Sequence, residues 1–141
     1  MIVLDTNVLS ELMRPQPDVS VLQWIDAQPA LQLFTTSITQ AEILAGIQML
    51  APGKRRSDLE NAALAMFAED FLNRVLPFDG NAASTYAAIT AQRRQRGRPI
   101  SQFDAQIAAI TAAHGARLAT RNESDFADCG IAVLNPWHLA P

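Results

Sequence analysis

The sequence predicts an α/β fold, with a mostly parallel sheet of about five strands and helices on both faces. Short β-like runs alternate with longer helical patterns along the chain, which is typical of strands joined by helical crossovers. Glycine and proline stand at the predicted ends of these segments, where they break regular structure. Because no repeat, low-complexity tract or linker interrupts the alternation, we expect a single domain over residues 1–141.

The expected elements follow one another in a regular order. The β-like runs are Ile2–Leu4, Leu31–Thr36, Arg74–Phe78, Arg117–Thr120 and Ile131–Leu134. The helical patterns are Asn7–Met13, Val19–Gln28, Gln40–Leu50, Asp58–Asn73, Asn81–Gln95 and Gln102–His114. Gly115 is placed to end the last helix. Two helices separate the third and fourth strands, so one of them must lie across the sheet or protrude from it.

The composition predicts a folded globular protein, since 49% of the residues are hydrophobic and 18% are charged. The longest apolar run, Ala62–Ala68, is far shorter than the roughly 20 residues that span a bilayer. Asp5 interrupts the apolar start of the chain, so no signal peptide is expected. Cys129 is the only cysteine and excludes an internal disulfide. We therefore expect a cytoplasmic protein without a membrane segment.

The net charge of −3 argues against broad, non-specific binding of nucleic acid by the whole surface. The positive charge is nevertheless unevenly placed: one segment holds Arg93, Arg94, Arg96 and Arg98, and Lys54–Arg56 forms a second cluster. The planar guanidinium group of arginine can grip phosphate oxygens with two hydrogen bonds. A solvated helix end is the alternative, because cations are favoured near a helix C-terminus.

Four acidic residues stand near the expected ends of strands or starts of helices. Asp5 follows the first strand, Glu42 lies at the start of the helix after the second, and Asp125 follows the fourth. Asp104 opens the helix 102–114. Each has a structural alternative: a helix N-cap for Asp5, a capping box for Glu42 and Asp104, and an Asx turn for Asp125.

The acids that follow strands are expected to converge, because ligands of open parallel sheets bind outside the carboxyl ends of the strands. Carboxylates gathered there raise one another's pKa unless a cation neutralises them. Carboxylate and water oxygens are the ligands that Mg²⁺ and Mn²⁺ prefer. Neither His114 nor His138 has a partner at the spacing of a zinc site. The order of elements alone does not return Asp104 to this edge.

Four segments in order carry a family resemblance: Met1–Leu12, Ser37–Gly46, the surroundings of Asp104, and Leu118–Asn122. Together they resemble the PIN-domain toxins of the VapC type, particularly their FitB-like branch. The resemblance implies a Rossmann-like, five-stranded parallel sheet with an acidic pocket that binds one or two Mg²⁺ or Mn²⁺ ions. By motif, Asp5, Glu42 and Asp104 match the three core acids of the family, which brings the acid at the position of Asp104 into the pocket.

The resemblance also bears on the remaining corner of the pocket. Thr6 and Thr120 match small hydroxyl residues near it. Several relatives carry an acid where this chain has Asn122, and Asp125 matches an alternative in which the fourth acid precedes phenylalanine. Either residue therefore remains a candidate to complete the site.

The resemblance implies a metal-dependent endoribonuclease, the toxin of a type II toxin–antitoxin system. Asp5 and Asp104 would hold the metal ion, while Glu42 and Asp125 would orient water. The candidates to position the RNA backbone are Arg93, Arg94, Arg96, Arg98 and Arg121. Trp24, Tyr86 and Trp137 are interpreted as core residues or as platforms on which bases stack.

The expected partners are RNA and a cognate VapB-type antitoxin, with operator DNA bound only through the antitoxin. We expect a homodimer, because Ala62–Phe71 and Ala105–Ala113 are apolar around much of each helix. Deep burial within one chain is the alternative interpretation of both helices.

Two other functions are compatible with parts of the pattern. An aspartyl-phosphate enzyme also places an aspartate after a strand, but it needs a lysine near the phosphate. Lys54, the only lysine, is expected in a loop far from Asp5 in sequence. A catalytically silent RNA-binding PIN module is the second alternative, although an intact carboxylate pocket repels RNA when no metal is bound.

Overall fold

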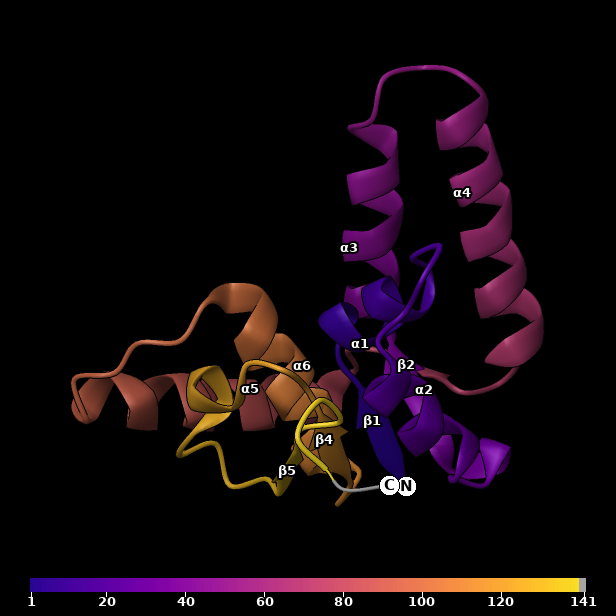
Figure 1. Cartoon of the computed structure of the whole chain (residues 1–141). Coiled ribbons are helices and arrows are strands. Elements are labelled where there is room, and N and C mark those ends of the chain that lie inside the picture. The colour runs from indigo at the N-terminus through magenta and orange to yellow at the C-terminus, as the bar shows by residue number, and fades with distance from the viewer. Residues whose placement is uncertain (140–141) are drawn as a thin grey trace.

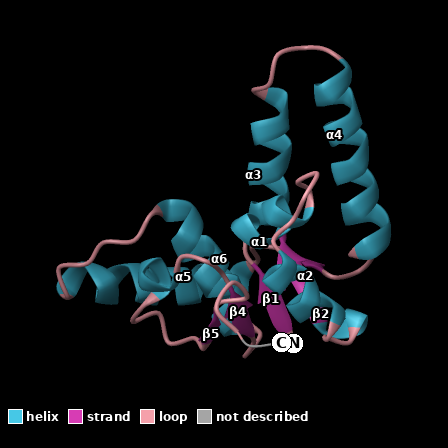
Figure 2. Cartoon of the chain, viewed as in Figure 1, coloured by secondary structure: helices cyan, strands magenta, loops and turns pink. Residues whose placement is uncertain are grey.

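The computed structural model describes residues 1–139 and confirms the α/β fold. Its five strands form one parallel sheet in the order β3-β2-β1-β4-β5. Figure 2 shows the strands in magenta, with β1, β2, β4 and β5 labelled. The strands are β1 (Ile2–Leu4), β2 (Leu33–Thr36), β3 (Val75–Leu76), β4 (Arg117–Ala119) and β5 (Val133–Leu134). Because β1 lies in the centre of the sheet, its carboxyl end opens between two neighbouring strands.

Six α-helices and three short helical turns connect the strands. The α-helices are α1 (Thr6–Leu12), α2 (Val19–Asp26), α3 (Ser37–Gln48), α4 (Lys54–Ala65), α5 (Gly80–Gln95) and α6 (Gln102–Ala113). The turns are two 3₁₀ helices, η1 (Ala30–Gln32) and η3 (Glu123–Phe126), and one π-helical segment, η2 (Met66–Asp70).

The sheet separates two hydrophobic cores, because successive side chains of a strand point to opposite faces. Ile2 and Leu4 pack in the first core, with residues of α1 to α4 and η2. Val3 packs in the second core, with residues of α5 and α6. The buried side chains of α6 belong to this second core, so burial within the chain explains the apolar segment Ala105–Ala113. Both faces of the short central strand are thereby fixed.

Two helical segments depart from the compact sheet (Figure 1). The pair α3 and α4 forms a hairpin that projects from the body of the molecule. Helix α5 extends sideways, and the loop 96–101 brings the chain back to the start of α6. Because α5 protrudes, two helices fit between β3 and β4 along the chain. Helix α6 can therefore begin at the carboxyl edge of the sheet, where it places Asp104.

Several predicted boundaries are wrong by a few residues. Strand β2 begins at Leu33 rather than Leu31, because a 3₁₀ turn precedes it. Helix α3 begins three residues before the predicted Gln40, since the side chain of Thr36 caps it by accepting a hydrogen bond from the Thr39 N–H at 3.0 Å. The prediction for Gly115 is confirmed, as its φ of 61° follows the end of α6.

None of the helices between residues 1 and 139 combines the length and hydrophobicity that crossing a bilayer requires.

Candidate acidic active site

Asp5 is a buried carboxylate at the carboxyl end of β1, with only 4% of the residue exposed. It accepts hydrogen bonds from the Thr120 hydroxyl at 2.7 Å, the Thr6 N–H at 2.8 Å and the Asn7 amide at 3.3 Å. Asp5 is also the N-cap of α1, so the capping interpretation is confirmed. Two further acids act on this carboxylate as well.

The electrostatic surroundings of Asp5 disfavour its charged form. Burial raises its pKa to about 6 from the ordinary 3.8, while hydrogen bonds from Thr120 and Thr6 oppose part of that rise. The negative charges of Asp104 and Glu42 make a smaller contribution to the same rise in pKa. Asp104 and Glu42 therefore both lie close enough to Asp5 to act on its charge.

Glu42 is half-buried in α3, and its Oε1 accepts a hydrogen bond from the Thr6 hydroxyl at 2.8 Å. The Thr6 hydroxyl also lies 3.0 Å from the Thr39 hydroxyl. The capping-box interpretation of Glu42 is wrong, because the residue that caps α3 is Thr36. The Glu42 side chain instead reaches across to the start of α1, beside Asp5.

Asp104 lies in the first turn of α6, and its N–H donates to the hydroxyl of the N-cap Ser101 at 3.2 Å. Burial is the main cause that raises the pKa of Asp104, and the hydrogen bond with Ser101 opposes it. The charge of Asp125 raises this pKa as well, while the charge of Arg93 lowers it. Asp125 is therefore close enough to act on Asp104, although it is exposed on η3.

A cavity of about 470 Å³ brings three of the four predicted acids together, Asp5, Glu42 and Asp104. It is lined by Asp5, Thr6, Asn7, Ser10, Glu11, Arg14, Glu42, Asp104, Arg121, Asn122 and Trp137. Thr120 lies directly behind it, hydrogen-bonded to Asp5. Asn122 lines the cavity and Asp125 does not, so the two candidates for the fourth corner occupy different positions.

The chemistry of this cavity suits a hydrated divalent cation. Its donors are carboxylate, hydroxyl and amide oxygens, which hard cations prefer. Among residues 1–139, no three histidine, cysteine or acidic side chains are placed to enclose one ion. Mg²⁺ is usually held by one or two carboxylates together with water and substrate phosphates, so an open acidic cavity fits it and a closed cage is not needed.

The prediction that Arg93 contacts RNA is wrong. Only 4% of Arg93 is exposed, since it continues the buried stripe of α5 at Ala82 and Ile89. Its guanidinium group donates to the carbonyls of Asp125 and Ala127 at 2.9 Å each, and to that of Arg98 at 2.6 Å. Arg93 therefore fixes the turn that carries Asp125 and has no access to a ligand in solution.

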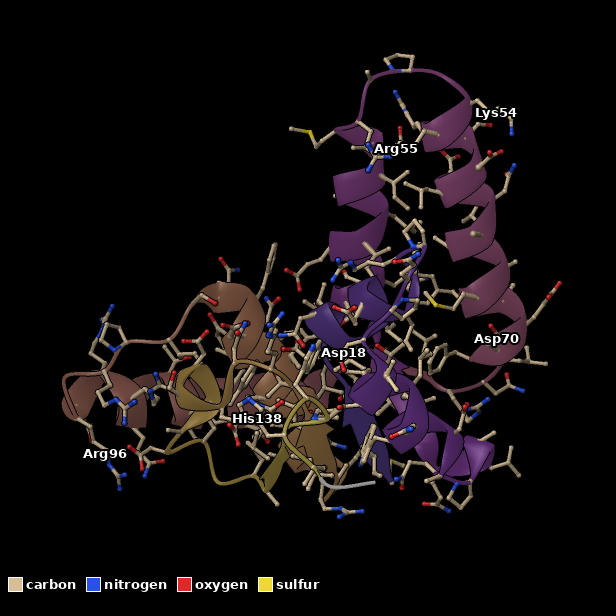
Figure 3. All side chains as sticks on the ribbon, viewed as in Figure 1. Asp18, Lys54, Arg55, Asp70, Arg96 and His138 are labelled. Atoms are coloured by element: carbon tan, nitrogen blue, oxygen red, sulfur yellow. The ribbon has the colours of Figure 1, made fainter. Side chains whose placement is uncertain are left out.

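Arg94, Arg96 and Arg98 are exposed, but none of them lines the acidic cavity. Arg96 and Arg98 form ion pairs with Asp128, at 3.0 and 3.4 Å. Figure 3 places Arg96 at the far end of α5, away from the sheet. Of the predicted RNA-binding arginines, Arg121 is the one that lines the cavity.

Three polar residues of the site, Asn7, Glu11 and Arg14, were not predicted from the sequence. Asn7 donates to Asp5 and to the Thr120 hydroxyl, and its place in the polar run after β1 was an available signal. Glu11 is buried, pairs with Arg14 at 3.2 Å and accepts from a backbone N–H at 2.9 Å. Both charges of this pair lie on or just after α1, so the pair borders the cavity on the side of that helix.

The three aromatic candidates have different surroundings. Trp24 belongs to the first core, and Tyr86 packs edge-on against Phe78. The core interpretation is therefore confirmed for these two residues. Trp137 also packs against the first core, but it lines the acidic cavity as well.

A second, larger cavity of about 730 Å³ lies beside the acidic one. It runs between α1, α3 and α4 and is mostly apolar, with Ile43, Ile47 and Leu59 among its walls. The two cavities share Thr6, Ser10, Arg14 and Glu42. A ligand lying along the apolar groove would therefore reach the carboxylates directly.

Comparisons with known proteins agree with this arrangement. The PIN domain family matches residues 2–131. The chain is 44% identical to VapC ribonuclease Y4jK of Sinorhizobium fredii, over 99% of this chain and 100% of that protein. It is 38% identical to toxin FitB of Neisseria gonorrhoeae, over 98% and 99%.

A structure of FitAB bound to an IR36 DNA fragment contains a chain that is 38% identical to this one. That chain matches with a TM-score of 0.93, over 100% of this chain and 99% of its own length. The fold, the ordered motifs and these relatives agree, and the chain belongs to the PIN-domain family, in the branch of the VapC and FitB toxins.

Proposed function

We propose that this protein is a metal-dependent endoribonuclease, the toxin component of a type II toxin–antitoxin pair. The observation that carries the proposal is the convergence of Asp5, Glu42 and Asp104 on one cavity, although they come from three separate elements. The rise in the pKa of Asp5 to about 6 supports a need for a neutralising cation there. The identity of 44% to a VapC ribonuclease supports the same activity.

PIN-domain ribonucleases depend in general on divalent metal ions, and we propose Mg²⁺ or Mn²⁺ for this chain. Asp5 and Asp104 would hold the ion, with Asp125 or Asn122 completing its surroundings. When bound, the ion would lower the pKa of water and polarise the scissile phosphate. Thr120 and Asn7 would keep the Asp5 carboxylate in a fixed orientation through their hydrogen bonds.

Glu42 is proposed to receive the proton of the attacking water. Its Oε1 is held by the Thr6 hydroxyl at 2.8 Å, which leaves the second carboxylate oxygen available. In the reaction a water oxygen forms a new bond to phosphorus, and the ester bond between phosphorus and the leaving ribose oxygen breaks. That leaving oxygen takes up a proton from solvent, so the step balances as a hydrolysis.

An antitoxin would restrain this activity by occupying the apolar groove between α1, α3 and α4. The groove opens onto Glu42 and Thr6, so a basic side chain of the bound segment would reach the carboxylates. The likeness to a FitAB complex with DNA supports this partner class. Binding of operator DNA would then belong to the antitoxin, in keeping with the net charge of −3 on this chain.

A homodimer is proposed through the outer face of α4 and η2. Leu64, Ala68 and Leu72 are exposed there at a helical spacing, while Phe67 and Phe71 are buried in the first core. The segment Ala62–Phe71 therefore keeps an uncovered apolar stripe. The chain is also proposed to act as a single domain.

Cleavage of single-stranded RNA by the purified protein tests the proposed function. Cleavage is expected with Mn²⁺ and is expected to disappear when EDTA is added. Asp5→Asn is expected to slow cleavage by more than about a hundredfold, since outer-shell partners of metal ligands already cause losses of that size. The matched control is Asp26→Asn, which removes an exposed acid of α2.

Two outcomes would contradict the proposal. Equal cleavage by Asp5→Asn and the parent protein would exclude an acid-dependent site. Binding of RNA without cleavage under every metal condition would favour the catalytically silent RNA-binding module. Co-expression with the neighbouring reading frame tests the antitoxin separately, since a small partner is expected to co-purify.

A further inference from the structure

Arg121 and Trp137 form a cation–π pair at the acidic cavity. The guanidinium carbon of Arg121 lies 5.1 Å from the centre of the Trp137 ring, within the range of a cation–π contact. Both residues line the cavity together with Asp5 and Asp104. Arg121 is exposed, whereas Trp137 is half-buried and packs against the first core. The Trp137 ring therefore holds the Arg121 guanidinium group beside the carboxylates.

Asn135 fixes both members of this pair. It is only 5% exposed, and its Oδ1 accepts from the Trp137 N–H at 3.0 Å. Its Nδ2 donates to Glu123 Oε2 at 3.2 Å and to the Arg121 carbonyl at 3.5 Å. From the other side, the Arg121 N–H donates to Asn7 Oδ1 at 3.2 Å. The backbone of Arg121 is thereby tied both to the turn that carries Trp137 and to the residues around Asp5.

Two arginines line the acidic cavity, and they differ in their partners. Arg14 pairs with the buried Glu11 at 3.2 Å, so much of its charge is compensated. Within residues 1–139, no carboxylate lies within ion-pair distance of the Arg121 guanidinium group. Asp128 pairs with Arg96 and Arg98, away from the cavity. Among the described residues, Arg121 is thus the arginine of the cavity whose charge is not compensated by an ion pair.

We infer that Arg121, supported by Trp137, binds a phosphate of the RNA backbone next to the phosphate that is cleaved. The inference rests on the proposed ribonuclease function. The contact with the indole ring holds the guanidinium group in place without using its N–H groups, which can grip phosphate oxygens with two hydrogen bonds. A positive charge there offsets the repulsion between RNA and the carboxylates. Trp137 and Asn135 act as positioning residues for Arg121.

Binding of a fluorescently labelled single-stranded RNA to the Asp5→Asn protein measures this contact without cleavage. Arg121→Met in that background is expected to weaken binding about tenfold, in line with a charge-assisted bidentate contact. The plot of log affinity against log salt is expected to lose about 0.7 of its slope, the value for one phosphate contact on a single strand. Arg117→Met is the matched control, because Arg117 is an exposed arginine at the opposite end of β4.

The intrinsic fluorescence of Trp137 gives a second readout, which loss of stability alone would not imitate. Addition of RNA is expected to change the emission of the Asp5→Asn protein, because the ligand contacts the guanidinium group stacked on the indole. Trp137→Phe is expected to remove that change, leaving the signal of Trp24, while binding weakens less than in Arg121→Met. Arg121→Lys is expected to keep the salt slope but to bind less tightly, since an ammonium group is not bidentate.

The outcomes separate the inference from the function on which it rests. Equal RNA affinity and equal salt slope for Arg121→Met and Arg117→Met would overturn the inference alone. A loss confined to the capture of a protein partner, with RNA binding unchanged in Arg121→Met, would also overturn it. Failure of the parent protein to bind or cleave RNA would overturn the proposed function as well. A folded Arg121→Met variant with a reduced affinity and a reduced slope would support the inference.

Discussion

Asp5 and Arg93 are both buried charges, each with 4% exposure, yet their surroundings treat them differently. Arg93 donates to the carbonyls of Arg98, Asp125 and Ala127, and these groups satisfy a cation well. Asp5 also accepts hydrogen bonds, but burial, together with the like charges of Asp104 and Glu42, raises its pKa to about 6. The Arg93 charge therefore stabilises the fold, whereas we propose that the Asp5 charge binds a metal ion.

The comparison predicts opposite effects on stability when each charge is removed. Loss of the Arg93 charge deprives buried carbonyl groups of their donors, which is costly. Loss of the Asp5 charge removes the cost of burying that charge and its repulsion by Asp104 and Glu42. If neutralising a residue stabilises the protein and abolishes its activity, that residue serves the activity at a cost in stability.

Arg93→Met is expected to cause the largest change, a loss of about 4 kcal/mol in the free energy of unfolding, since several charge-assisted hydrogen bonds are broken at once. Urea denaturation measures it. Arg94→Met is the matched control, because Arg94 is the exposed neighbour, and its effect should stay within about 0.5 kcal/mol. Equal free energies of unfolding for the two variants would show that the hydrogen bonds of Arg93 do not stabilise the fold.

Asp5→Asn is expected to stabilise the metal-free protein at pH 7.5. In the folded chain Asp5 keeps its proton up to a pH of about 6, but in the unfolded chain only up to about 3.8. Raising the pH through this window therefore lowers the free energy of unfolding of the parent protein by up to about 3 kcal/mol, at 1.36 kcal/mol per pKa unit. The variant lacks that penalty, so the two proteins should differ at pH 7.5 and converge below pH 4.

Urea denaturation in EDTA, repeated across this pH range, measures the difference. Equal stabilities of Asp5→Asn and the parent at pH 7.5 would mean that the Asp5 carboxylate is not held under strain. In a separate series without EDTA, Mn²⁺ is expected to raise the free energy of unfolding of the parent protein and to leave that of Asp5→Asn unchanged. The reason is that an ion stabilises only the state that binds it.

Thr6→Val tests whether Glu42 needs its hydrogen bond at 2.8 Å. The substitution keeps the shape of the side chain and removes the hydroxyl that orients the carboxylate. We expect cleavage to slow by about thirtyfold, within the range for outer-shell partners of a metal site. Thr85→Val is a suitable control, because that exposed hydroxyl of α5 bonds only its own helix backbone at 3.1 Å. Equal rates for both variants would assign Thr6 to packing.

The fourth corner of the site is expected to give the smallest effects. Asp125→Asn should slow cleavage by about fivefold, because Asp125 is exposed and acts on Asp104 only through its charge. Asn122→Ala should raise the metal concentration needed for half-maximal activity, since Asn122 lines the cavity. A larger loss for Asp125→Asn than for Thr6→Val would place Asp125 among the direct ligands.

The alternation of segments was enough to predict the fold, and strand ends were enough to predict that Asp5 and Glu42 would meet. Asp104 was harder, because its return to the site depends on the sideways course of α5, which leaves no mark in local sequence. The family motif supplied that position instead. Exact helix starts were missed where two threonines, Thr36 and Thr39, both suit an N-cap.

The arginine segment shows why residue type alone misled the functional prediction. Four arginines in close succession suggested a surface for RNA, yet Arg93 lies at positions +4 and +11 from the buried Ile89 and Ala82 of α5. That helical spacing was a usable signal for burial, because it continues an apolar stripe. The cation–π contact between Arg121 and Trp137 had no such signal, since it depends on how the segment after β5 packs against the segment after β4.

The hydrogen bond between Thr120 and Asp5 joins residues 115 positions apart in the chain. Asp5 is translated 99 residues before Asp104 and 115 residues before Thr120. The proposed active site therefore stays incomplete until the chain has been translated as far as Thr120. For the proposed ribonuclease, this order of synthesis delays the assembly of the acidic cavity until β1 can pair with β4.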